Sequence, residues 1–245
     1  DFFKYLNPVK VTEYSLWAST YIIAEKFNVP LIIQGENPGL TLGARNTGVG
    51  IDSNALKANE LNTISDDWRD YLEVEGIEER DLYFLHYNRT LLEDNGVKAI
   101  WLNYYLKDFT NHDNAVFSKL HGLQWRPDDF DHKSIGTYSP YFQLDTDLTQ
   151  VNQLLKFIKF GFGQCMDHVC YDFRENRISR KEAIKLVLEL DGKCSNEYIE
   201  KFCKYIEISQ DEFWSVTEEF RGDMWVKNSN GEWENKIHEI LDNEC

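Results

Sequence analysis

A helix, a short apolar strand and an acidic turn follow one another without a break near the start of this chain. The apolar residues of the segment Val9–Phe27 recur with a helical period, and Leu31–Ile33 predict a buried strand that begins after Pro30. The strand leads into a Gly-Glu-Asn-Pro turn. Ligands of open α/β sheets bind at the carboxyl ends of the strands. This order predicts an α/β domain with a ligand site at that turn.

A second apolar run, residues 97–102, predicts another buried strand, and a helix is expected over 111–121. Strand and helix thus alternate, as they do in domains built on a parallel sheet. From Asp147 onward the apolar spacing is helical, and a small hairpin is expected at 225–233. The helices expected there are 148–162, 164–175, 179–190, 195–206 and 209–220. The sequence therefore predicts an α/β part followed by a mainly helical part.

Charge and cysteine content exclude several classes of protein. The 245 residues carry a formal net charge of −16 at pH 7, whereas a nucleic-acid binder needs a basic footprint. No apolar run approaches the roughly 18 residues that a membrane helix requires. Five Cys, an odd number without regular spacing, are typical of reduced thiols in a cytosolic protein. We therefore expect a cytoplasmic protein with neither nucleic acid nor membrane as a partner.

The turn after the first strand is one candidate site. Glu36 could hold Mg²⁺ on a nucleotide or orient a nucleophile, because its carboxylate is expected at the mouth of a parallel sheet. Gly35 would let a ligand approach the backbone, and Asn37 adds a polar side chain beside it. The alternative is an acidic surface turn that has no role in binding.

The segment from Lys156 to Arg180 is a second candidate site, because its charges crowd around a double-glycine break at Gly161 and Gly163. Lys and Arg can bind a phosphate or a sugar carboxylate, and Asp167 could act as an acid or a base if its pKa is shifted. The expected contacts to substrate or phosphate are Lys156, Lys159, Asp172, Arg174 and Arg180. The alternative is a pair of helices with solvated charges.

Three potential zinc ligands, Cys165, His168 and Cys170, lie within six residues. Their spacing differs from that of a zinc knuckle. Ordinary packing of free cysteines is the alternative, and the sequence favours it.

Several segments resemble the N-acetyl sugar amidotransferases, a family of the PP-loop ATP pyrophosphatase group. They are residues 7–9 (NPV), 32–38 (IIQGENP), 155–163 (LKFIKFGFG) and 177–183 (RISRKEA). The likeness spans nearly the whole chain, and it is nearest to the pseudaminic acid type, which modifies sugars of flagellin or lipopolysaccharide. The resemblance implies a Rossmann-like PP-loop sheet that binds ATP and Mg²⁺.

The resemblance also implies a reaction in which an acetamido group of a bacterial surface sugar or nonulosonic acid becomes an acetamidino group. ATP would activate the amide oxygen as an adenylate, and ammonia from a separate glutaminase subunit would then displace AMP. In this view Glu36 and Asp167 are catalytic, and Gly35, Glu36 and Asn37 lie near ATP and its metal.

One departure from the family is clear, because the Ser-Gly-Gly-x-Asp-Ser loop that holds the pyrophosphate does not occur in this sequence. We therefore interpret residues 1–125 as the second half of the nucleotide-binding domain, 126–146 as a connecting segment and 147–245 as a helical domain that covers the sugar. Such a chain should expose an apolar sheet edge and associate into homo-oligomers. One alternative is a non-catalytic sugar- or partner-binding module. Another is a relative that thiolates tRNA, but the net charge of −16 argues against it.

Overall fold

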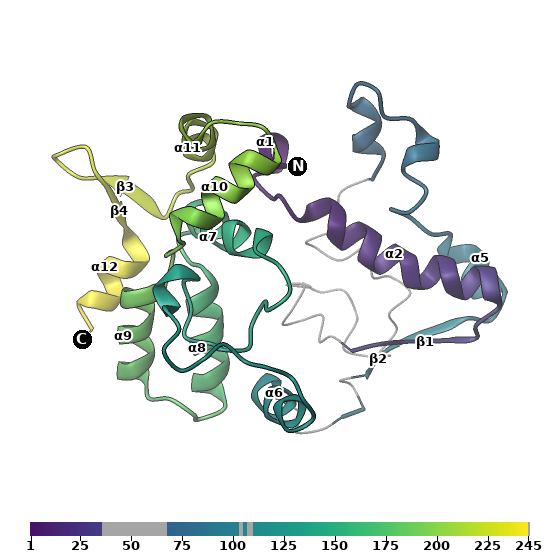
Figure 1. Ribbon diagram of the computed structural model, residues 1–245, viewed down its shortest axis with the longest axis horizontal. Helices are drawn as coiled ribbons and strands as arrows, with labels where there is room; N and C mark the ends of the chain where they lie inside the picture. The colour runs from purple at the N-terminus through teal and green to yellow at the C-terminus, as the bar shows by residue number, and fades with distance from the viewer. Residues whose placement is uncertain (36–67, 103–104, 107–109, 245) are drawn as a thin grey trace. The chain divides into compact units, whose positions relative to one another are not determined.

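The computed structural model describes residues 1–35, 68–102, 105–106 and 110–244, and its backbone divides into two compact units (Figure 1). The sheet unit is Lys10–Phe117, and the helical unit combines Asp1–Val9 with Ser118–Cys245. The helix α6 (Asn111–Leu120) leads from one unit into the other. Each unit is described below by itself.

The sheet unit is built on two parallel strands and one long helix. Helix α2 (Lys10–Phe27) ends at Asn28, whose φ of 52° is left-handed, and the chain continues into β1 (Leu31–Gln34). Strand β2 (Lys98–Trp101) pairs with β1 in parallel, with Ile32 opposite Ala99. The remaining elements are the 3₁₀ turns η2 (Trp68–Glu73) and η3 (Glu79–Asp81) and the helix α5 (Arg89–Asp94). Both predicted strands and the long first helix are confirmed.

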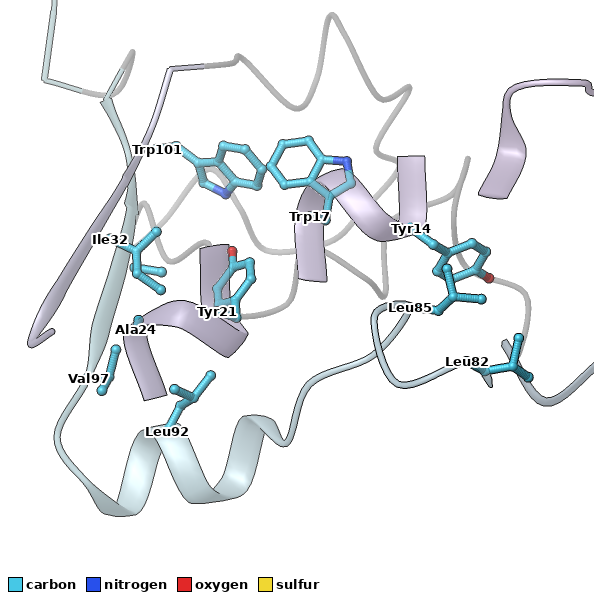
Figure 2. Close-up of a cluster of buried hydrophobic side chains, with 11 residues drawn as sticks. Tyr14, Trp17, Tyr21, Ala24, Ile32, Leu82, Leu85, Leu92, Val97 and Trp101 are labelled. Carbon is cyan, nitrogen blue, oxygen red and sulfur yellow. The ribbon is translucent and has the colours of Figure 1, made fainter. Parts of the chain in front are cut away.

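One face of α2 supplies most of the core of this unit. Tyr14, Trp17, Tyr21 and Ala24 recur every three or four residues and are almost fully buried. Figure 2 shows Trp17 meeting the ring of Trp101, and the two centroids are 5.3 Å apart in an edge-to-face arrangement. The burial of these large side chains holds the strand pair against the helix.

Strand β1 is covered on one face only in the part of the chain that the structure describes. Ile32 and Gln34 are buried, whereas Leu31 is 45% and Ile33 is 55% exposed. The prediction that Leu31–Ile33 is buried throughout is therefore wrong for its two outer residues. The reason is geometric, because successive side chains of a strand point to opposite faces and α2 packs on one of them.

The helical unit combines residues from both ends of the sequence. Helix α1 (Phe2–Tyr5) brings Phe2, and the turn after it brings Leu6, into a core shared with α7, α10 and α11. The helices are α7 (Leu148–Phe160), α8 (Gln164–Arg174), α9 (Arg180–Leu190), α10 (Asn196–Tyr205), α11 (Gln210–Glu219) and α12 (Lys236–Asp242), and the turn η5 (His132–Ser134) precedes them. The five long helices and the hairpin of β3 (Trp225–Lys227) and β4 (Trp233–Asn235) confirm the prediction.

Helices α8 and α9 lie side by side in this unit (Figure 1). Between them Cys165, Val169, Ala183 and Val187 form a second small core. Ser179 caps α9 by accepting a hydrogen bond from the Glu182 N–H, as its Ser-x-x-Glu sequence predicts.

The structure is thus a mixed α/β chain with a small parallel sheet and a helical C-terminal region. Two parallel strands do not identify a Rossmann-like PP-loop sheet, so that part of the expectation stays a prediction. Among the described helices, none combines the length and the apolar character needed to cross a membrane.

Candidate functional site

The first candidate site is only partly described. Gly35 lies exposed directly after β1, at the carboxyl end of the strand pair. Glu36 and Asn37 lie outside the described residues. Their expected place beside ATP and its metal therefore stays a prediction.

In the second candidate site, Lys156 and Asp167 form an ion pair. Lys156 comes from the last two turns of α7 and Asp167 from the first turn of α8, so the pair bridges the glycine-rich turn between the helices. The Lys156 ammonium also lies 4.9 Å from the ring centroid of Phe162, in that turn. Both charged side chains are partly exposed. Two predicted site residues are thus in direct side-chain contact.

Asp191, at the end of α9, was not predicted and organises this region. Its side chain is 3% exposed, and its carboxylate accepts hydrogen bonds from the main-chain N–H groups of Gly163 at 2.8 Å, Cys165 at 3.0 Å and Met166 at 3.3 Å. Burial raises the pKa of the Asp191 carboxyl, while these donors and the Lys156 charge oppose the rise. The Asp191 carboxylate thus caps the first turn of α8, although it lies 25 to 28 residues further along the chain than the N–H groups that it binds.

The glycines of the α7–α8 turn are required by this arrangement. Gly161 has a φ of 77°, and a Cβ there would lie 2.5 Å from Met224 Cβ. A Cβ on Gly163 would lie 2.9 Å from Asp191 Oδ1. Because the Asp191 carboxylate needs that space to reach the helix terminus, the FGFG sequence encodes a turn, and the turn sets where Lys156 and Asp167 meet.

His168, the residue after Asp167 on α8, is buried and neutral. Its Nδ1 lies 2.5 Å from Thr137 Oγ1, and that oxygen also accepts the Ser139 N–H at 3.3 Å. A neutral ring can accept the Thr137 hydroxyl proton at Nδ1, which leaves its own N–H at Nε2. Burial is the main cause that lowers the pKa of His168 to about 4; the charge of Asp172 opposes the shift and that of Lys156 adds to it. The ring is therefore uncharged at neutral pH.

Asp172 belongs to a second ion cluster on the same helix. It accepts the Tyr138 hydroxyl at 2.6 Å and the Arg177 Nε–H at 3.1 Å, and Arg177 also pairs with Glu175. Burial and the contact with Asp172 raise the pKa of the Tyr138 phenol. Tyr138 and Arg177 were not predicted, and both tie the loop before α7 and the α8–α9 connection to α8.

The other predicted cations contact acceptors in different parts of the chain. Lys159 donates to the Tyr5 carbonyl oxygen at 2.8 Å, which fixes α1. Arg174 donates to the Cys170 carbonyl oxygen at 2.8 Å, and Arg180 pairs with Glu244 near the end of the chain. Each of these three cations thus has a protein acceptor, and the expected contacts of all five residues with a substrate stay a prediction.

The three potential zinc ligands are not brought together. Cys165 is fully buried and its thiol faces the Leu186 carbonyl oxygen at 3.5 Å, Cys170 is exposed, and His168 bonds Thr137. Among the residues that the structure describes, no group of three or more His, Cys, Asp or Glu could hold a metal ion. Buried packing explains Cys165, and its pKa is raised by that burial.

Comparison with models of known protein families gives a match in the helical unit. Residues 135–239 match the family described as LPS biosynthesis protein WbpG-like, C-terminal domain. The matched range contains Lys156, Asp167, His168, Asp172 and Asp191, and it lies within the helical unit. No curated protein matches the chain at a significant level.

Proposed function

We propose, from the premise that residues 135–239 form a WbpG-like C-terminal domain of lipopolysaccharide biosynthesis, that this protein is an ATP-dependent N-acetyl sugar amidotransferase. The family match is the observation that carries the proposal. It supports a role in lipopolysaccharide biosynthesis. The resemblance of the Ile32–Pro38 and Leu155–Gly163 segments to the amidotransferases supports the reaction type. The substrate would be a bacterial surface sugar or a nonulosonic acid that carries an acetamido group.

The proposed reaction replaces the oxygen of the acetamido group with nitrogen. Adenylation of the acetamido oxygen releases pyrophosphate and converts that oxygen into part of a good leaving group. Ammonia then attacks the activated carbon, and AMP departs with the former amide oxygen, so the product carries an acetamidino group. Activation is needed because an amide oxygen is a poor leaving group by itself.

Roles for individual residues follow from where each one lies. Lys156 and Asp167 are the candidates for contact with the sugar, because they are paired, partly exposed and held in place by the buried Asp191. Gly35, Glu36 and Asn37 remain the candidates for ATP and Mg²⁺, since Gly35 follows a strand of a parallel pair. Lys159, Arg174 and Arg180 are weaker candidates, because the contacts that they make serve the fold.

The proposal implies a partner and a compartment. Ammonia would come from a glutaminase subunit that contacts this protein, and the supply of ATP places the reaction in the cytoplasm.

Because the loop that holds the pyrophosphate does not occur in this sequence, the test uses the full-length protein with a complete nucleotide-binding domain. It is combined with ATP, Mg²⁺, an ammonium salt and a panel of N-acetyl sugars, some of them nucleotide-activated and some nonulosonic. Ammonium replaces the glutaminase. We expect AMP and pyrophosphate to form only with an acceptable sugar, and mass spectrometry should find NH in place of the amide oxygen in the product.

Variants assign the roles in the same assay. Lys156→Met and Asp167→Asn should each reduce the sugar-dependent formation of AMP, whereas Lys133→Met, in the exposed turn η5, should not. Sugar binding without any AMP would instead support the non-catalytic binding module. If no sugar of the panel is bound and none is converted, the proposal is contradicted.

A further inference from the structure

The carboxylate of Asp167 and the ring of Phe162 together hold a positive charge in this structure. The Lys156 ammonium donates to the carboxylate and lies 4.9 Å from the centroid of the ring. Carboxylates and aromatic faces are both groups that bind cations in proteins. We call Asp167 and Phe162 the cation site. From α7, Lys156 places its own ammonium there.

A ligand can reach the cation site, because the side chain of Asp167 is 38% exposed and that of Lys156 is 24% exposed. By contrast, Asp172 and Asp191 are more deeply buried, and each accepts several hydrogen bonds from other parts of the chain. An ionised carboxylate can accept more hydrogen bonds than one ammonium supplies. A partly exposed ion pair also adds little stability, so Asp167 can exchange Lys156 for another cation at little cost.

The proposed reaction starts from a neutral group and ends with a cation. An acetamido group is uncharged, whereas an acetamidino group is a strong base and is protonated at neutral pH. Ammonia supplies the electron pair of the new C–N bond, and the C–O bond breaks with its electron pair going to the phosphate of AMP. Of the four protons on the amide nitrogen and ammonia, three stay on the amidinium and one is released to solvent. The two organic products are therefore a planar cation and a phosphate anion.

The groups around Lys156 match both products. A planar amidinium presents two N–H groups to a carboxylate and its face to an aromatic ring, so Asp167 and Phe162 suit it. Once displaced from Asp167, the Lys156 ammonium is a donor for a phosphate. One exchange of partners thus supplies an opposite charge to each product.

We propose that the cation site of Asp167 and Phe162 binds the acetamidinium group of the product, and that Lys156 leaves this site to bind the phosphate of AMP. This inference rests on the proposed function, because it takes an acetamidino sugar as the product. Both contacts strengthen as the C–O bond breaks, since the positive charge on the sugar and the negative charge on the phosphate develop in that step.

The experiment measures equilibrium binding of two probes by the full-length protein, with and without AMP. The probes are the methyl glycoside of N-acetylglucosamine and the same glycoside with an acetamidino group in place of the acetamido group. With AMP present, we expect the acetamidino probe to bind about tenfold more tightly, since charge-assisted hydrogen bonds are roughly twice as strong as neutral ones. AMP should also tighten binding of the acetamidino probe more than that of the acetamido probe, because it draws Lys156 out of the cation site. Equal affinities, or an equal effect of AMP on both probes, would overturn the inference.

Substitutions of the two paired residues should act in opposite directions on the acetamidino probe. Asp167→Asn removes the negative charge and should abolish the preference for this probe. Lys156→Met removes the competing cation, so without AMP it should tighten binding of the probe several-fold. Asp147→Asn, which breaks an exposed ion pair with Lys201, is the matched control and should change neither affinity. If both substitutions of the Lys156–Asp167 pair weaken the acetamidino probe alike, the pair serves only the fold and the inference is wrong.

The inference and the proposed function can fail separately. Formation of AMP with the sugar panel tests the function, whereas the two probes test the cation site. If the panel yields AMP but the probes bind equally or not at all, only the cation site is contradicted. If a substituted protein does not fold, the effect of AMP on the wild type still decides, because it needs no substitution.

Discussion

At the scale of single residues, the helical unit is organised by two buried polar groups that sequence patterns do not reveal. Asp191 caps α8 from the end of α9, and Thr137 meets His168 across 31 residues. The sequence predicted Asp167 and Lys156 from their chemistry and their nearness along the chain. It could not predict Asp191 or Thr137, because contacts at such separations depend on how the helices pack. The glycines Gly161 and Gly163 were the sequence signal for this region, since two glycines so close together indicate that another part of the chain packs closely against the turn.

The burial of His168 predicts how the stability of the fold depends on pH. Its folded pKa of about 4 lies below the ordinary value of 6.5, so the unfolded chain binds the proton more tightly and stability must fall as the pH drops from about 6.5 to about 4. The loss should reach up to about 3 kcal/mol, since each pKa unit is worth about 1.4 kcal/mol.

The measurement is the free energy of unfolding by denaturant at a series of pH values, for the wild type and for His168→Gln. Carboxylates also titrate in this range, so the difference between the two proteins isolates the histidine. The wild type should lose stability more steeply than the variant. Parallel pH profiles would show that His168 does not carry the effect.

At the scale of elements, periodicity predicted the helices well because each one buries a single apolar stripe. The five long helices after Asp147 and the hairpin lie where the sequence places them. Burial of β1 was predicted less well, because Leu31–Ile33 is apolar at every position while α2 covers one face. An apolar run alone does not tell how many faces will be covered. The distinction requires knowledge of the neighbouring layer.

The α7–α8 turn gives a prediction at this scale. Gly161→Ala should destabilise the protein more than Gly231→Ala, although both glycines have a left-handed φ, of 77° and 83°. Both variants pay a conformational penalty of about 1 kcal/mol. Only at Gly161 would the new Cβ clash, because the Cβ of Met224 would lie 2.5 Å away. Overpacking of this kind costs roughly a further 1–3 kcal/mol. Thermal or denaturant unfolding of the two variants measures the difference, and equal losses would argue against the close packing of this turn.

At the scale of the whole molecule, the chain has two units with different characters. The helical unit encloses apolar cores among its helices, whereas the sheet unit leaves Leu31 and Ile33 exposed on β1. Exposed apolar side chains on a strand favour association with another chain. The sequence predicted a homo-oligomer, and the exposed face of β1 is the surface at which that prediction can be tested.

Sedimentation velocity over a range of concentrations provides that test. We expect the wild-type chain to self-associate, and Ile33→Lys to shift the distribution toward the monomer, because a charge on that face opposes its burial. Leu120→Lys is the matched control, since Leu120 is equally apolar and is exposed on α6. A wild type that stays monomeric at high concentration, or a control that acts like Ile33→Lys, would contradict this prediction.

The central claim concerns the fate of one oxygen atom. An N-acetyl sugar labelled with ¹⁸O at its acetyl carbonyl is incubated with the full-length protein, ATP, Mg²⁺ and ammonium, and the AMP is analysed by mass spectrometry. The account predicts that the label appears in AMP in step with formation of the acetamidino sugar. Unlabelled AMP, with the ¹⁸O retained in the sugar, would contradict it.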